Sequence, residues 1–80
     1  MTMDAGKLTR MANQIAEFFA AEPDAKVGVA GVVNHIQKFW EPRMRKAILA
    51  AFDAGQTEAM HPLVVAALAE HRQQLEPVGR

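Results

Sequence analysis

The chain contains no cysteine, no tyrosine and no serine among its 80 residues, and it has a single tryptophan. Without cysteine it forms no disulfide and offers no thiolate ligand to a metal. Nucleophilic catalysis needs an activated hydroxyl, thiol, amine or carboxylate held beside a base. The hydroxyl groups are those of Thr2, Thr9 and Thr57, so this inventory is nearly empty. We therefore expect no catalytic site and no cofactor of its own.

A charge excess of either sign is also absent, because nine Lys and Arg residues balance nine Asp and Glu residues. Bulk attraction to nucleic acid or to anionic lipid is therefore not expected. The longest apolar runs, residues 47–52 and 63–69, are too short to span a bilayer. The N-terminus lacks an apolar signal segment, so we expect a cytoplasmic location without membrane contact.

Half of the residues are hydrophobic, and their spacing of three and four positions predicts an all-α fold. Asp4 can cap a first helix over residues 5–21, which Pro23 ends because the residue before a proline avoids the α region. Asp24 can cap a second helix over residues 25–40.

The valine-rich start of this second helix has a rival interpretation as a strand. We favour a helix, because the polar residues that follow keep helical spacing and no partner strand is evident. Gly28 and Gly31 match neither common phosphate-binding motif. We expect them to allow a neighbouring helix to approach closely.

Two prolines begin the remaining helices, since proline is favoured in the first helical position. Pro42 opens a third helix over residues 42–54, and Gly55 supplies the left-handed conformation common just after a helix. Pro62 opens a fourth helix over residues 62–75. The prediction is a small four-helix domain with short connections between neighbouring helices.

We expect residues 1–80 to form a single domain with a flexible tail at residues 76–80. The three histidines, His35, His61 and His71, fall on different predicted elements and lack nearby acidic or thiolate partners, so no metal site is expected.

The segment around Pro42 combines aromatic and cationic side chains. Phe39 and Trp40 precede the proline, and Arg43 and Arg45 follow it. Cations are unfavourable at a helix N-terminus, where the macrodipole is already positive. One interpretation is a structural corner in which Trp40 covers the helix junction and an arginine pairs with a carboxylate, Glu41 or Asp53. The other is a contact for a partner, because Trp and Arg are enriched where binding energy concentrates.

Three segments of the chain resemble one known protein family. They are residues 7–19 (KLTRMANQIAEFF), residues 39–45 (FWEPRMR) and residues 61–64 (HPLV), the last followed by an alanine-rich helix. The family is the delta subunit of the NAD-dependent formate dehydrogenases of the molybdenum or tungsten type. The resemblance covers about residues 7–75. Glu41 departs from it, since aspartate, a better helix cap, is expected before the proline.

The resemblance implies a non-catalytic subunit. In such enzymes a large alpha subunit oxidises formate at a molybdenum or tungsten bis-pterin centre, and iron–sulfur clusters pass electrons to flavin- and NAD-binding subunits. The implied role is to bind this molybdopterin-containing alpha subunit within the complex, stabilising it or helping it assemble. The residues that we expect at this contact are Phe39, Trp40, Arg43, Met44 and Arg45, with Arg10 and Asn13 as weaker candidates.

Other functions fit the same residues. The chain could act as a transient maturation factor for the molybdenum-containing subunit, or as a freestanding helical interaction or regulatory domain. A small enzyme using acid–base pairs is a further alternative. Equimolar amounts of the chain in the active enzyme would argue against a maturation factor. Activity of the isolated chain on a substrate would be needed to support an enzyme.

Overall fold

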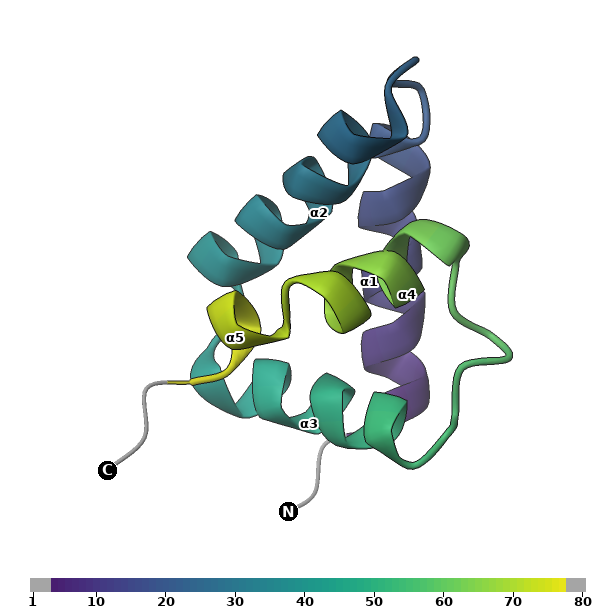
Figure 1. The fold of residues 1–80 in the computed structure, drawn as a ribbon. Coiled ribbons are helices and arrows are strands. Elements are labelled where there is room, and N and C mark those ends of the chain that lie inside the picture. The colour runs from purple at the N-terminus through teal and green to yellow at the C-terminus, as the bar shows by residue number, and fades with distance from the viewer. Residues whose placement is uncertain (1–3, 78–80) are drawn as a thin grey trace.

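The computed structural model describes residues 4–77, and its ordered elements are helices (Figure 1). In chain order they are α1 (Ala5–Phe19), α2 (Ala25–Phe39), α3 (Pro42–Asp53), α4 (Pro62–Glu70) and α5 (Arg72–Leu75). This confirms the all-α prediction, and residues 27–33 are helical, not a strand. The predicted flexible tail, residues 76–80, lies mostly outside the described residues.

The helix starts follow the expected caps. The Asp4 side chain accepts a hydrogen bond from the Gly6 amide at 2.9 Å. Asp24 accepts one from the Lys26 amide, also at 2.9 Å. These bonds satisfy amide groups that have no partner inside the helix. Gly55 adopts a φ of 81°, the left-handed conformation expected after α3.

All four predicted helices end earlier than the sequence predicts, and α2 and α3 do so by one residue each, at Phe39 and Asp53. Helix α1 stops at Phe19 and not at residue 21, because the Glu22 amide turns back to the Phe19 carbonyl (3.1 Å) ahead of Pro23. The expected fourth helix is interrupted at His71, whose φ of −122° and ψ of 33° lie outside the helical region. This bend separates α4 from α5 and turns Leu75 into the core, where it is 1% exposed.

Helices α1 and α2 lie closest beside the connection 20–24 and spread apart toward α3, while α4 packs across both (Figure 1). The position of a Cβ on Gly31 would lie 2.3 Å from Cδ1 of Phe19, so that ring occupies the space a larger residue would fill. On Gly28, a Cβ would lie 3.0 Å from the Phe19 carbonyl oxygen. The expected close approach of a neighbouring helix is confirmed at Gly28, whereas Gly31 makes room for the Phe19 ring.

The core lies between α4 and the other helices. Its largest fully buried side chains are aliphatic, each stabilising the fold by about 1.5–3 kcal/mol relative to full exposure: Val32, Ile36, Ile48, Val64, Leu68 and Leu75. Met11 and Met44 are half-buried against this core.

Candidate interaction surface

The two aromatic residues before Pro42 point in different directions. Trp40 leaves the helical conformation (φ −86°, ψ 135°) while its amide still donates to the Ile36 carbonyl. Its side chain is buried, with 6% of the residue exposed. Phe39, one position earlier, is 70% exposed. Trp40 therefore belongs to the core, and Phe39 presents the aromatic surface at this junction.

The cations of this junction are not neutralised within residues 4–77. Arg43 is exposed and Arg45 is half-buried, and neither forms an ion pair in this part of the chain. The expected pairing of one of them with Glu41 or Asp53 is therefore not found. Nε of Arg45 is buried and has no hydrogen-bond partner among the described residues.

The first turn of α3 also lacks a side-chain cap. Glu41 occupies the N-cap position, but its carboxylate makes no capping hydrogen bond. The Glu41 carbonyl instead accepts hydrogen bonds from the amides of Met44 (2.9 Å) and Arg45 (3.1 Å). A capping side chain would accept from the amide of Arg43 or Met44, and the Glu41 carboxylate accepts from neither. We name Phe39, Trp40, Arg43, Met44 and Arg45 together the α2–α3 corner.

The two weaker candidates on α1 lie next to the connection 54–61. Arg10 and Asn13 line a shallow pocket together with Gln56 and Ala59. The Asn13 amide nitrogen donates to the Ala59 carbonyl at 2.7 Å, and its oxygen accepts from the His61 amide at 2.8 Å. Asn13 thus fastens this connection to α1, while Arg10 remains exposed beside it.

A second exposed aromatic surface was not anticipated. Phe18 is 75% exposed and meets Phe19 edge to face, with ring centroids 5.0 Å apart. Together with Ile15 and His35, these rings line a groove of about 280 Å³ between α1 and α2. Adjacent helix residues point about 100° apart, and pairs such as Val32 and Val33 are both buried here, so the sequence alone does not mark Phe18 as exposed.

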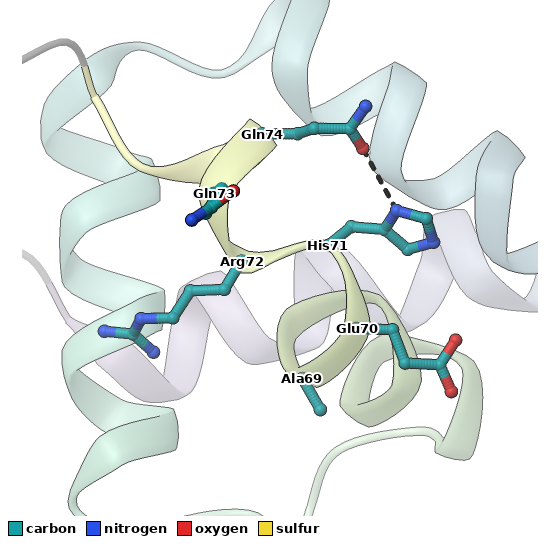
Figure 2. Close-up of a pocket in the computed structure, with 6 residues that line it drawn as sticks. All are labelled: Ala69, Glu70, His71, Arg72, Gln73 and Gln74. Atoms are coloured by element: carbon teal, nitrogen blue, oxygen red, sulfur yellow. Dashed lines mark hydrogen bonds between the residues drawn. The ribbon is translucent and has the colours of Figure 1, made fainter.

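The three histidines serve the fold. Nδ1 of His61 accepts a hydrogen bond from the Leu63 amide at 3.0 Å and so caps α4. His35 lies against Phe39, with ring centroids 4.8 Å apart. In the open pocket of Figure 2, Nδ1 of His71 lies 3.0 Å from Oε1 of Gln74. No group of three metal-ligating side chains occurs within residues 4–77.

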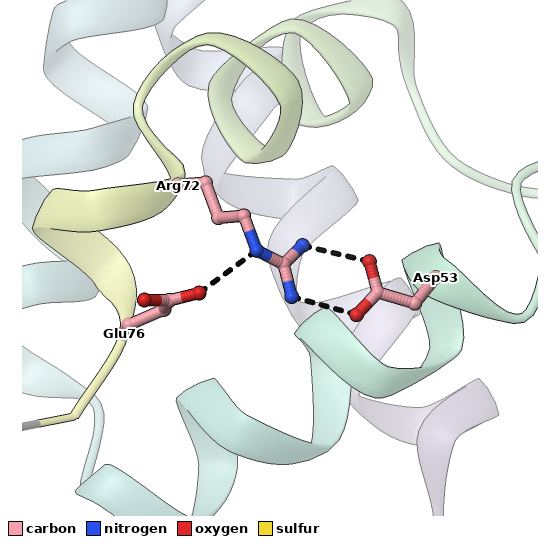
Figure 3. A network of polar contacts seen from close by, with 3 residues as sticks. All are labelled: Asp53, Arg72 and Glu76. Carbon is pink, nitrogen blue, oxygen red and sulfur yellow. Dashed lines mark hydrogen bonds and ion pairs between the residues drawn. The ribbon is translucent and has the colours of Figure 1, made fainter. Parts of the chain in front are cut away.

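Asp53, which was considered as a partner for an arginine near Pro42, pairs instead with Arg72. Both terminal nitrogens of Arg72 donate to the Asp53 carboxylate, at 2.7 and 2.6 Å, and Nε donates to Glu76 at 2.8 Å (Figure 3). The hydrogen bond to Asp53 and that to Glu76 raise the pKa of Arg72. This bidentate contact joins the C-terminal end of α3 to α5.

Comparison with known proteins places the chain in a family. No helix in the described part of the chain has the length and apolar character to cross a membrane. No curated protein and no solved structure matches the chain. Residues 7–68, however, match the family described as NADH-dependant formate dehydrogenase delta subunit FdsD. This match covers most of the 80 residues and includes residues 7–19, 39–45 and 61–64, the three segments that carry the resemblance. The chain therefore belongs to the family of formate dehydrogenase delta subunits.

Proposed function

We propose that this chain is a non-catalytic subunit that binds the large, molybdopterin-containing alpha subunit of formate dehydrogenase and stabilises it or helps it assemble. The family match over residues 7–68 is the observation that carries this proposal. A delta subunit of formate dehydrogenase belongs to a complex with other subunits. The histidines, the side chains best suited to acid–base chemistry near neutral pH, make contacts within the fold, which supports an accessory role.

The α2–α3 corner is the contact that we propose for the alpha subunit. Phe39 offers an exposed ring, and the exposed Arg43 is free to pair with a carboxylate through two hydrogen bonds. Arg45 keeps a buried Nε without a partner, and a buried unsatisfied donor costs about 1–3 kcal/mol.

The other candidate residues take different parts in this proposal. Trp40 and Met44 support the corner from inside, because both pack against the core. Arg10 and Asn13 stand beside the connection 54–61, and a role for them at the contact remains a prediction.

The experiment is co-purification of the alpha subunit with tagged variants of the full chain. Phe39→Ala and Arg43→Ala should each weaken binding by about 2 kcal/mol, or about 30-fold in Kd, the size of a hot spot. Lys26→Ala, an exposed cation at the start of α2, is the control and should bind like the wild type. Unchanged binding by both corner variants would contradict the proposed contact.

Trp40→Ala is a poor test of the same contact. The side chain is buried, so its removal should cost about 3–5 kcal/mol of folding stability, whatever it contributes to binding.

The stoichiometry of the purified complex shows whether the contact is permanent. Equimolar amounts of this chain in the purified active enzyme would support a structural subunit, and its loss on maturation would support an assembly factor.

A further inference from the structure

One histidine begins a helix with its ring. Nδ1 of His61 accepts a hydrogen bond from the Leu63 amide at 3.0 Å, in a partly buried position at the start of α4. Histidine is not among the residues preferred at this position. Only a ring nitrogen that carries no proton can accept a hydrogen bond, so this cap requires the neutral imidazole. We propose that His61 is a pH-sensitive cap, which holds the first turn of α4 while the ring is neutral and releases it when the ring gains a proton.

Protonation acts directly on the capping bond. A charged imidazole carries a proton on both ring nitrogens, so its Nδ1–H would point at the N–H of Leu63, and two donors cannot share a hydrogen bond. The ring must then turn away, and the Leu63 amide loses its partner. The positive charge also arises at the N-terminus of α4, where the helix macrodipole is positive and the first turn carries no acidic residue.

The cap lies where three helices meet. The backbone amide of His61 donates to Oδ1 of Asn13 on α1 at 2.8 Å, in a partly buried position. Leu63 faces α2, since a Cβ on Gly28 would lie 3.6 Å from Cδ1 of Leu63. Release of the Leu63 amide therefore loosens the first turn of α4 at the point where it is joined to both α1 and α2.

Charged groups from the surrounding segments act on the same ring. Glu22 of the connection 20–24 lines a pocket of about 240 Å³ together with His61, and the part of α2 that lines this pocket carries no charged side chain. On α1, Arg10 and Glu17 stand one turn before and after the residue bonded to His61, and Glu58 precedes it in its own connection.

These groups do not reverse the effect of the cap. The three carboxylates favour a charged ring, but they are exposed and therefore screened, and an exposed pair contributes less than a helix cap. The C-terminal end of α1, which also lines the pocket, favours a positive charge, whereas the N-terminal end of α4 opposes it. The contact at Nδ1 therefore decides the sign.

Acid should consequently destabilise the folded chain. In the unfolded chain the ring has no amide to cap, so the unfolded chain binds this proton more readily, and the stability falls as the pH falls. An imidazole changes its charge between about pH 8 and pH 5. The cap of α4 is made at the upper end of this range and lost at the lower end.

His71 supplies a contrast within the same chain. Its Nδ1 lies 3.0 Å from Oε1 of Gln74, an oxygen that can only accept. The ring nitrogen of His71 is thus the donor, and a protonated ring keeps this bond. Of these two histidine bonds, protonation breaks the one made by His61 and leaves the one made by His71.

The test compares urea unfolding of full-length chains at pH 8 and at pH 5.5. His61→Asn retains a good capping side chain that does not titrate, so its difference from the wild type isolates the histidine cap. Between these pH values the unfolding equilibrium constant of the wild type should rise about fivefold more than that of His61→Asn, the equivalent of one lost cap. His71→Gln is the matched control and should remain at least as sensitive to acid as the wild type. An equal pH dependence of the wild type and His61→Asn would overturn the proposal.

Nuclear magnetic resonance of the unsubstituted chain tests the same bond without a variant. As the pH falls, the protection factor of the Leu63 amide against hydrogen exchange should drop about fivefold, with the midpoint of the His61 ring titration. A Leu63 amide that stays protected while the His61 ring titrates would overturn the proposal. So would a His61 ring that stays neutral throughout the range from pH 8 to pH 5.

Discussion

The two hydrogen bonds of Asn13 allow a quantitative test of how the long connection before α4 is held. Replacing Asn13 with alanine leaves the Ala59 carbonyl and the His61 amide without their partner. Ala59 is exposed, so water can replace the amide there at a cost of about 0.5 kcal/mol. The His61 amide is half-buried and should lose about 1.5 kcal/mol. The gross loss of folding stability is therefore about 2 kcal/mol.

A gain offsets part of this loss. Alanine is a better helix former than asparagine by roughly 0.6 kcal/mol. The expected net destabilisation of Asn13→Ala is then about 1.5 kcal/mol, or a Tm lower by about 6–12 °C for a domain of this size. Urea and thermal unfolding followed by circular dichroism at 222 nm measure both values.

The matched control is Asn34→Ala on α2. Asn34 is exposed, so this variant carries the gain in helix propensity without the loss of the hydrogen bonds. It should be equal to the wild type or slightly more stable, and the two variants should differ by about 2 kcal/mol. The reasoning is refuted if Asn13→Ala matches Asn34→Ala in stability. If Asn13→Ala instead keeps the wild-type stability but loses binding to the alpha subunit, Asn13 belongs to the partner contact, as the sequence analysis suggested.

Two further substitutions test local features of the helices. Glu41→Asp should supply the missing cap of α3 and raise the stability by about 0.5–1 kcal/mol, measured by the same unfolding experiments; an unchanged Tm would show that this helix end needs no cap. Gly31→Ala should lower the stability by about 1–2 kcal/mol, because its Cβ meets the Phe19 ring. In a Phe19→Ala background the same change should instead raise the stability by about 1 kcal/mol, the gain in helix propensity, and a persistent loss there would point to another cause.

The sequence was sufficient for features that depend on neighbouring residues. Asp4 and Asp24 begin helices, Pro42 and Pro62 occupy first helical positions, and Gly55 follows α3, each as local chemistry requires. These features determine an all-α chain. They also determine where the helices begin, since a cap or a proline acts within one turn, whereas all four predicted helices end earlier than expected.

Features that depend on distant residues were not predictable in the same way. Residues 70–74 are all compatible with a helix, yet the chain bends at His71, and Leu75 beyond the bend is buried in the core. The Arg72–Asp53 contact joins residues 19 positions apart in sequence. The bonds of Asn13 to the connection before α4 span 46 and 48 positions. No periodicity in the sequence records such pairs.

The candidate site shows a related limit. Composition indicates that Phe39 and Trp40 are important, but only the backbone at residue 40 decides which ring enters the core. The same holds for Phe18 and Phe19, where the space above Gly31 accepts one ring and leaves the other exposed. A hydrophobic pattern cannot assign adjacent aromatics to a core or to a partner, because both destinations favour the same side chains.

Phe18 and Phe39 are therefore the positions at which folding and binding can be separated. Each is at least 70% exposed, so the fold gains little from either ring. Trp40 stabilises the core, and its removal alters the fold before it alters any interface. A strong effect of Phe18 or Phe39 on the complex must then come from contact with a partner, since the isolated chain offers these rings almost nothing to pack against. By the same logic Arg43, exposed and unpaired within residues 4–77, is the arginine that we propose for binding, and Arg72, held by Asp53 and Glu76, stabilises the fold.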